Sequence, residues 1–125
     1  MPDDAKPMPT SQFIDIDSVP WQELAPGARM KVLYKNNEAQ QATLLLEVDP
    51  GGTIPDHIHT GIEQTYVFEG SMEDADGVCS AGNFVVRLAG SRHEVHCPNG
   101  ARFMVFFQEP SKNVESGRLF PDYSV

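Results

Sequence analysis

The sequence predicts an all-β fold built as a single antiparallel β domain. Short runs of β-prone residues recur about every ten residues, and turn-forming Gly, Pro, Asn and Asp separate them. Gly and Pro contribute 10 residues each to the 125 of the chain, a composition typical of many short elements. Apolar residues at helical spacing occur only weakly, near residues 19–24, so no long amphipathic helix is expected.

Seven strands are expected along the chain. In order they are Met30–Tyr34, Ala42–Val48, Ile54–His59, Gln64–Phe68, Asn83–Leu88, Glu94–Cys97 and Arg102–Gln108. Turn signals separate them at Pro26-Gly27, Asn36-Asn37, Pro50-Gly51-Gly52, Asp74-Ala75-Asp76-Gly77, Ala81-Gly82, Ala89-Gly90 and Pro98-Asn99-Gly100. Alternation supports the second strand, where Leu44, Leu46 and Val48 share one face. The acidic run 73–76 is interpreted as a solvated hairpin turn.

The two ends of the chain lack a clear period. Residues 1–11 mix Pro, Asp, Lys and Ser and are expected to form a flexible arm. Residues 12–110 are expected to form the one domain that 125 residues allow. Residues 111–125 are expected to be a C-terminal tail that docks on the domain or on a partner subunit through apolar residues such as Leu119 and Phe120.

The charge balance excludes two classes of partner and favours one compartment. Nine Lys and Arg against 18 Asp and Glu give a net charge of -9, without the basic clusters that nucleic-acid binding requires. The apolar stretches are much shorter than the roughly 20 residues of a membrane-spanning helix. The N-terminus lacks the apolar core of a signal peptide. We therefore expect a cytoplasmic protein whose Cys79 and Cys97 are reduced.

Three side chains in the middle of the chain have the spacing of metal ligands. His57 and His59 are two residues apart on an expected strand, so both imidazoles point to one face. A three-residue connection that contains Gly61 favours a hairpin, which would bring Glu63 beside His59. Two imidazoles and a carboxylate suit first-row metals such as iron, manganese or zinc.

A fourth ligand would come from another part of the chain, where three side chains are candidates. His93 begins an expected strand directly after a glycine turn. His96 follows three residues later, so it faces the opposite side of a regular strand, exposed or at the mouth of the site. Cys97 shares a face with His93 only if the strand is undistorted. The residues alone leave this choice open.

The spacing of these residues resembles the two signature motifs of the cupins. The first motif, Gly-x5-His-x-His-x3-Glu-x6-Gly, is met without a gap by Gly51, His57, His59, Glu63 and Gly70. The second motif, Gly-x5-Pro-x-Gly-x2-His-x3-Asn, is met in part by Gly82, Gly90 and His93. Leu88 and Cys97 stand where this second motif has Pro and Asn.

The resemblance implies a cupin jelly-roll barrel, also called a double-stranded β-helix, that holds one divalent transition metal. Carried over by motif position, the metal ligands are His57, His59, Glu63 and His93. Fe(II) is favoured, with Zn, Mn, Ni and Cu as alternatives, because ligand affinity alone does not sort these ions. Small cupins are by resemblance dimers, so a homodimer is also expected.

Two groups of cupins are similar to this chain and imply different functions. The stretch 59–71 resembles the cupin domain of ChrR-type zinc-dependent anti-sigma factors. It is equally similar to small cupin dioxygenases, such as 2,4'-dihydroxyacetophenone dioxygenase and acetylacetone dioxygenase. The first interpretation is a non-haem oxidoreductase, a dioxygenase for a small carbonyl compound, diketone or aromatic ketone. The alternatives are a non-catalytic, sensor-like module for zinc or a small ligand, and a metal-dependent isomerase, so catalysis itself stays open.

A pocket for a small-molecule ligand or substrate is expected inside the barrel. By strand parity, Thr65 and Val67 face the same interior as Glu63. The further pocket-lining residues are taken to be Phe103, Val105 and, at the mouth, His96. No catalytic residue is assigned. An isomerase would need charged side chains inside the barrel, where the strands offer mainly Arg87 and Gln108.

Overall fold

The structure is a computed structural model that describes residues 10–122 of the chain. Most of the arm expected at residues 1–11 and the last three residues of the expected tail, 123–125, lie outside the described residues. None of the helical structure within 10–122 is long and apolar enough to cross a membrane.

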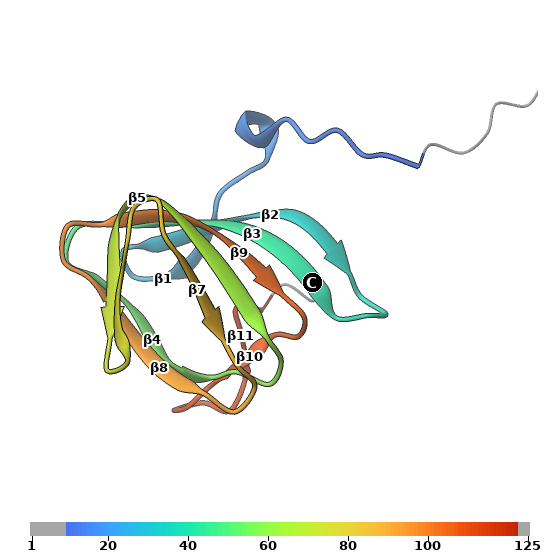
Figure 1. The fold of residues 1–125 in the computed structure, drawn as a ribbon. Coiled ribbons are helices and arrows are strands. Elements are labelled where there is room, and N and C mark those ends of the chain that lie inside the picture. The colour runs from blue at the N-terminus through green and yellow to red at the C-terminus, as the bar shows by residue number, and fades with distance from the viewer. Residues whose placement is uncertain (1–9, 123–125) are drawn as a thin grey trace, which may run out of the picture.

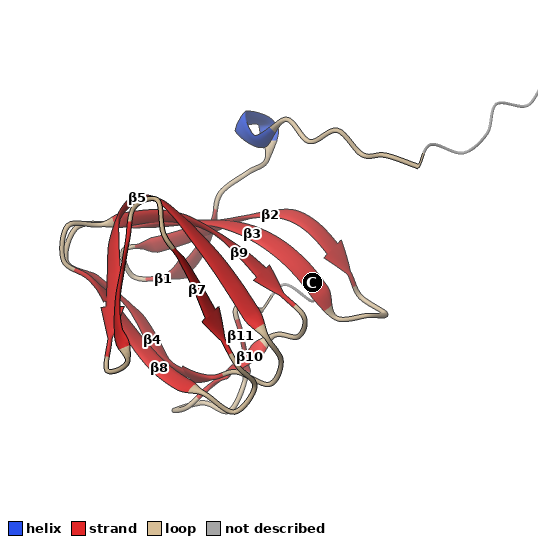
Figure 2. Cartoon of the chain, viewed as in Figure 1, coloured by secondary structure: helices blue, strands red, loops and turns tan. Residues whose placement is uncertain are grey.

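The described chain is a β structure with one short 3-10 helix, which confirms the all-β prediction (Figure 2). The elements are η1 (Ile16–Ser18), β1 (Gln22–Ala25), β2 (Ala28–Asn36), β3 (Gln41–Val48), β4 (Gly52–Ile58), β5 (Glu63–Asp74), β6 (Gly77–Ser80), β7 (Phe84–Arg87), β8 (Arg92–Cys97), β9 (Ala101–Phe107), β10 (Ser111–Asn113) and β11 (Leu119–Phe120). Each predicted strand corresponds to one of these. The strands β1, β6, β10 and β11 were not predicted, because two to four residues are too few to display a period.

Antiparallel pairing curls the strands into a barrel of two sheets that share β5 (Figure 1). In the first sheet the order is β1-β2-β3-β9-β5-β7, and residues 63–70 of β5 take part. In the second sheet β5 pairs with β6 and β8, β8 with β4, β4 with β10, and β10 with β11. One long strand therefore joins the two walls of the barrel, which explains why β5 extends well beyond the predicted residues 64–68.

Gly70 lies where β5 passes from one sheet to the other. Its φ of +73° is in the region that favours glycine. A Cβ at this position would lie 2.0 Å from the carbonyl oxygen of Gly100. A side chain at this position would thus push β5 away from Gly100, which directly precedes β9.

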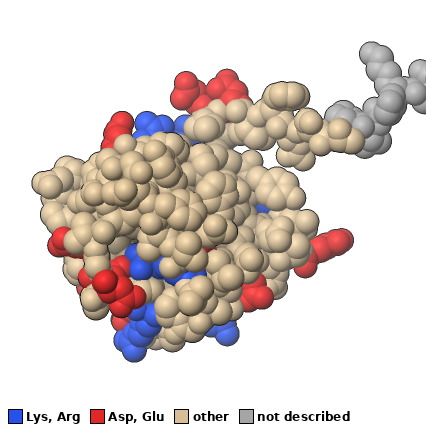
Figure 3. Space-filling model, viewed as in Figure 1, with Lys and Arg blue, Asp and Glu red and all other residues tan. Residues whose placement is uncertain are grey.

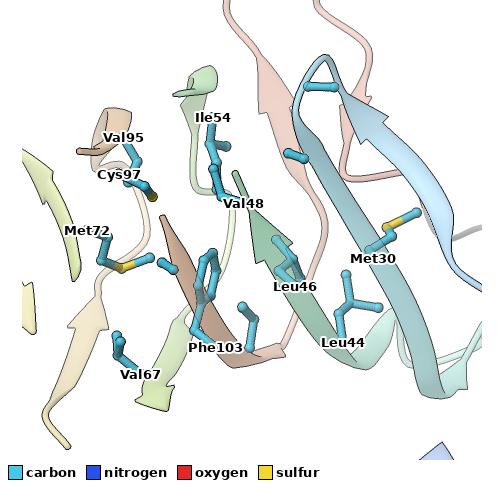
Figure 4. Close-up of a cluster of buried hydrophobic side chains, with 14 of the residues drawn as sticks. Met30, Leu44, Leu46, Val48, Ile54, Val67, Met72, Val95, Cys97 and Phe103 are labelled. Atoms are coloured by element: carbon cyan, nitrogen blue, oxygen red, sulfur yellow. The ribbon is translucent and has the colours of Figure 1, made fainter. Parts of the chain in front are cut away.

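The interior between the sheets is apolar over much of its length. Figure 4 shows buried side chains from both walls, among them Leu46, Val67 and Phe103 of the first sheet and Ile54 and Val95 of the second. Period-2 alternation places these residues on the inner face of their strands. The same alternation also brings several polar residues inside, and these make up the candidate site.

The prediction of a solvated turn over residues 73–76 is wrong at Asp74. This residue ends β5, its side chain is only 4% exposed, and its Oδ2 lies 2.6 Å from Nη2 of Arg87 on β7. The turn itself comprises only residues 75 and 76. Pairing of β5 with β6 extends the strand through the acidic run, which local composition does not reveal.

The C-terminal segment adds two short strands to the edge of the second sheet. Lys112 and Asn113 of β10 pair with Ile58 and His57 of β4, and β11 pairs with β10. Phe120 of β11 packs against the core, with its ring centroid 5.8 Å from that of His57. This part of the chain therefore lies against one end of the barrel interior.

Candidate metal centre

Two cross-strand pairs supply most of the polar side chains inside the barrel. His57 on β4 lies opposite His93 on β8, and Glu63 on β5 lies opposite Arg87 on β7. Directly opposite residues of an antiparallel pair share one face. All four side chains are buried, so both pairs point into the interior.

His59 lies one residue beyond the end of β4, and its backbone is hydrogen-bonded to Gly90 and Ser91 in the second motif. Its N–H donates to the carbonyl of Ser91, and its own carbonyl accepts from the N–H of Gly90. Potential ligand atoms of His57, His59 and Glu63 lie within 4.8 Å of one another. The structure thus brings these three predicted ligands together.

His93 lies beside this cluster and also contacts a second one. Its ring centroid is 5.4 Å from that of His59. Its Nδ1 lies 3.6 Å from a carboxylate oxygen of Asp74 and the same distance from one of Asp76, which are the other members of a second cluster of possible ligands. His93 therefore connects the barrel interior with the acidic residues at the end of β5.

The three imidazoles have their Nδ1 atoms turned towards acceptors. His57 Nδ1 donates to the carbonyl of Pro55 at 2.7 Å. His59 Nδ1 lies 3.0 Å from Ser111 Oγ and 3.1 Å from Glu63 Oε2. His93 Nδ1 faces the carboxylates of Asp74 and Asp76. A proton on Nδ1 leaves the Nε2 lone pair available, which is the usual arrangement of metal-binding histidines.

Two of these Nε2 atoms, those of His59 and His93, are buried and have no hydrogen-bond partner among the described residues. A buried polar atom without a partner costs about 1–3 kcal/mol, so such atoms are rare and need an explanation. An ion coordinated by both lone pairs would remove this cost. Three imidazoles beside a carboxylate therefore fit a divalent transition metal.

The electrostatics of the site favour the neutral form of the three histidines, which is the form that binds metals. Burial, with His57 and His93 nearby, lowers the pKa of His59 to about 3, and burial also lowers the pKa of both neighbours. All three rings are thus neutral at pH 7, as metal binding requires. Burial raises the pKa of Glu63 to about 7, although Arg87 and the hydrogen bond from Thr65 act in the opposite direction. A cation beside Glu63 would favour its ionised form.

A small cavity of about 30 Å³ adjoins His57 and Glu63. Its wall is mainly apolar and includes Ile54, Val95, Phe103, Val105 and Phe107, with Arg87 as the third polar residue. Leu24 of β1 and the C-terminal residues Phe120 and Pro121 also line it. A volume of this size holds about two water molecules.

The residues predicted to line the pocket have different positions. Phe103 and Val105 line the cavity. Thr65 and Val67 are fully buried on the inner face, and Thr65 Oγ1 donates to Glu63 Oε1 at 3.1 Å. His96 lies on the outer face, where its side chain is 52% exposed and its ring contacts Thr53 and Glu94. It does not line the cavity, because alternation along β8 turns residues 93, 95 and 97 inward instead.

Three contributors to the site were not among the predicted site residues. Arg87 was expected only as a charged side chain inside the barrel. The alternation along β7, which turns residue 87 inward, could have identified it as a site residue. Ser111 and Phe120 come from the C-terminal segment, and nothing in their local sequence indicates contact with the histidines. Only the pairing of β10 with β4 places them there.

Comparison with known sequences identifies relatives of this chain. Residues 9–112 match the model of the ChrR cupin-like domain. The anti-sigma-E factor ChrR of Cereibacter sphaeroides is 30% identical over 86 residues, which are 67% of this chain and 39% of that protein. The chain thus spans well under half the length of this relative.

Solved structures share the architecture. An acetylacetone dioxygenase from Acinetobacter johnsonii superposes with a TM-score of 0.79 at 18% identity, covering 92% of this chain and 86% of the other. ChrR in complex with SigE from Rhodobacter sphaeroides superposes with a TM-score of 0.66 at 23% identity, covering 74% of this chain and 51% of the other. These likenesses confirm the cupin fold, and the sequence match shows that the chain belongs to the family of ChrR cupin-like domains.

Proposed function

We propose that this chain binds one divalent transition metal inside the barrel through His57, His59, Glu63 and His93. The observation that carries this proposal is the pair of buried Nε2 atoms without partners, on His59 and His93, next to a buried carboxylate. Each ring already has its Nδ1 turned towards an acceptor, so the ligand set is oriented in advance. Fe(II) is the ion that we favour.

We further propose that the site is catalytic and that its reaction is dioxygenation of a small carbonyl compound. When bound, the metal would supply Lewis acidity and a place for oxygen and substrate to meet. The chain contributes the apolar walls formed by Phe103, Val105 and Phe107, which limit the amount of water beside the metal. Glu63 contributes a carboxylate whose charge the cation would stabilise. The shared fold over nearly the full chain with an acetylacetone dioxygenase supports this reaction class.

A second candidate function is a non-catalytic metal-holding module that contacts a protein partner. Two observations favour it: the sequence relative is an anti-sigma factor, and the cavity of about 30 Å³ is small for an organic substrate. In this case the metal would stabilise the barrel. The partner would bind the outer surface of the barrel.

The homodimer is proposed to form through an apolar outer face of the first sheet. This face is defined by Tyr66, Phe68, Phe84, Val86 and Phe106, each 39–50% exposed. Figure 3 shows mainly uncharged atoms over the upper part of the face where β5 and β7 lie, with charged side chains in a hollow below it and at the edges of the molecule. At roughly 200 Å² per aromatic side chain, the exposed parts sum to about 400 Å², half of the ~800 Å² that each partner buries in a standard interface. A second copy presents the same uncharged face, and we expect Val86→Asp to convert a dimer into a monomer in sedimentation equilibrium.

Elemental analysis and oxygen uptake test the two functions. We expect one metal ion per purified chain, and a sharp loss of metal in His93→Ala. His96→Ala is the matched control, because it removes an imidazole from the outer face of the same strand. Full metal content in His93→Ala would remove this residue from the ligand set. Oxygen uptake with β-diketones or hydroxyacetophenones and added Fe(II) supports the dioxygenase, whereas tight zinc without uptake supports the metal-holding module.

A further inference from the structure

A surface groove and the inner cavity share part of their walls. The groove has a volume of about 400 Å³ and lies between the end of β5, β6 and β7. Met72 and Arg87 line both the groove and the inner cavity of about 30 Å³. These two side chains therefore lie where the groove adjoins the inner cavity, which His57 and Glu63 also line.

Arg87 is a buried cation at this boundary, only 7% exposed. Its Nη2 lies 2.6 Å from Oδ2 of Asp74, which is the ion pair that the structure gives it. A guanidinium has five N–H donors in a planar fork, so one such contact uses a fraction of its capacity. Arg87 also lines the inner cavity together with His57 and Glu63, so its positive charge acts on the interior.

Asp74 does not depend on Arg87 alone. Its Oδ1 accepts from the backbone N–H of Asp76 at 2.8 Å, and His93 Nδ1 lies 3.6 Å from its Oδ2. Burial raises the pKa of Asp74, but the contacts with Asp76 and Arg87 outweigh this effect and leave the pKa below its ordinary value. Arg87 can therefore share its donors with a second carboxylate without leaving Asp74 uncompensated.

Charge balance around the interior favours an anion. A divalent metal and Arg87 carry three positive charges, and Glu63 and Asp74 carry two negative charges when ionised. One positive charge remains in a site whose other walls are mainly apolar, when Asp76 is left out of the sum because its side chain is 76% exposed. A monoanion would neutralise it, and a planar carboxylate fits the fork of a guanidinium through two parallel hydrogen bonds.

We propose that Arg87 is the anion-binding residue of this site and that the ligand is a small monoanionic 2-oxo acid. The carboxylate would bind Arg87, the neighbouring carbonyl would point towards His57 and Glu63, and the rest of the molecule would occupy the groove. This inference rests on the proposed metal centre, and it narrows the substrate class from small carbonyl compounds in general to anionic ones. Asp76, at the rim of the groove, is exposed to solvent, which screens its repulsion of an anion.

The test compares two probes of nearly equal shape, pyruvate and its neutral amide, pyruvamide, which differ by one negative charge. Their binding to the zinc-loaded chain is measured by isothermal titration calorimetry, because zinc has no redox chemistry. We expect the chain to bind pyruvate at least about tenfold more tightly than the neutral amide. Equal affinities, or no binding of either probe, would overturn the proposal.

Variants separate Arg87 from a general charge effect. Arg87→Gln is expected to weaken pyruvate binding by about 10- to 100-fold and to leave pyruvamide binding unaffected. Arg92→Gln is the matched control, because it removes an arginine from an exposed ion pair with Asp56 and changes the net charge equally. Asp74→Asn keeps the cation and is expected to tighten pyruvate binding, which tests the idea even if Arg87→Gln does not fold. Unchanged pyruvate affinity in a folded Arg87→Gln, or weaker binding in Asp74→Asn, would refute it.

The same measurements separate this inference from the proposed function. Arginine-dependent pyruvate binding without oxygen uptake would retain the anion site and reject the dioxygenase. Oxygen uptake with neutral diketones, together with pyruvate binding that Arg87→Gln does not alter, would retain the dioxygenase and reject the anion site. Metal content of each variant is measured in parallel, so that loss of the metal is not mistaken for loss of the anion site.

Discussion

Replacement of Glu63 by Gln is expected to stabilise the metal-free protein at neutral and alkaline pH. In the folded chain, burial raises the pKa of this carboxyl to about 7, against an ordinary value of 4.5. At about 1.4 kcal/mol for each pH unit between these values, ionised Glu63 costs the folded chain about 3 kcal/mol. The amide in the variant carries no charge, and its oxygen can still accept the hydrogen bond from Thr65.

The sign of this effect depends on pH in a defined way. Between pH 4.5 and 7 the folded chain holds a proton that the unfolded chain has released, so the free energy of unfolding falls as pH rises through this window. Below pH 4.5 both states are protonated, and the wild type and the variant are expected to be about equally stable. Above pH 7 the variant is expected to be more stable by about 3 kcal/mol.

Urea unfolding in EDTA, followed by circular dichroism from pH 4 to 8.5, measures this difference. Glu38→Gln, which changes an exposed carboxylate in the turn between β2 and β3, is the control and is expected to give no such trend. A difference between Glu63→Gln and wild type that does not change with pH would refute the reasoning, as would a less stable variant at pH 8. With zinc bound the order is expected to reverse, because the cation needs the carboxylate.

Three further substitutions test the close approach at Gly70, the contact between Ser111 and His59, and the low pKa of His59. Gly70→Ala should lower the free energy of unfolding by about 3 kcal/mol or more, because the added Cβ would clash with Gly100. Gly82 also has a positive φ, but a Cβ added there would meet open space, so Gly82→Ala should lower this free energy by only about 1 kcal/mol. Equal losses in denaturant titrations of the two variants would contradict the clash with Gly100. Ser111→Ala should weaken metal binding by about 10- to 100-fold in competition with a chelator, since it removes a contact that orients His59; unchanged affinity would exclude this role. Because the folded-state pKa of His59 is about 3, the free energy of unfolding of the metal-free protein should fall as the pH is lowered from 6.5 towards 3. In His59→Gln this free energy should depend less on pH. An equal decline in both proteins would exclude His59 as the source of the pH dependence.

Much of the architecture was accessible from the sequence because it depends on local patterns. Alternation in residues 42–48 and 102–108 reflects strands with one face inside the barrel, and the structure has β3 and β9 there. The spacing of His57, His59 and Glu63 spans a strand end, a short connection and the next strand start, so a few local rules brought these residues together. The very short strands and the length of β5 were not predictable in this way.

The sequence by itself determined the all-β class and the position of the cluster of His57, His59 and Glu63, whereas the burial along β8 decided between His93 and His96. Only the tertiary structure decided what surrounds them. Asp74 meets Arg87 because β5 bends at Gly70 and contributes to both sheets. Ser111 and Phe120 reach the imidazoles because β10 pairs with β4, more than 50 residues earlier in the chain. Such contacts depend on which distant strands pair, and the periodicity of one strand carries no information about its neighbours.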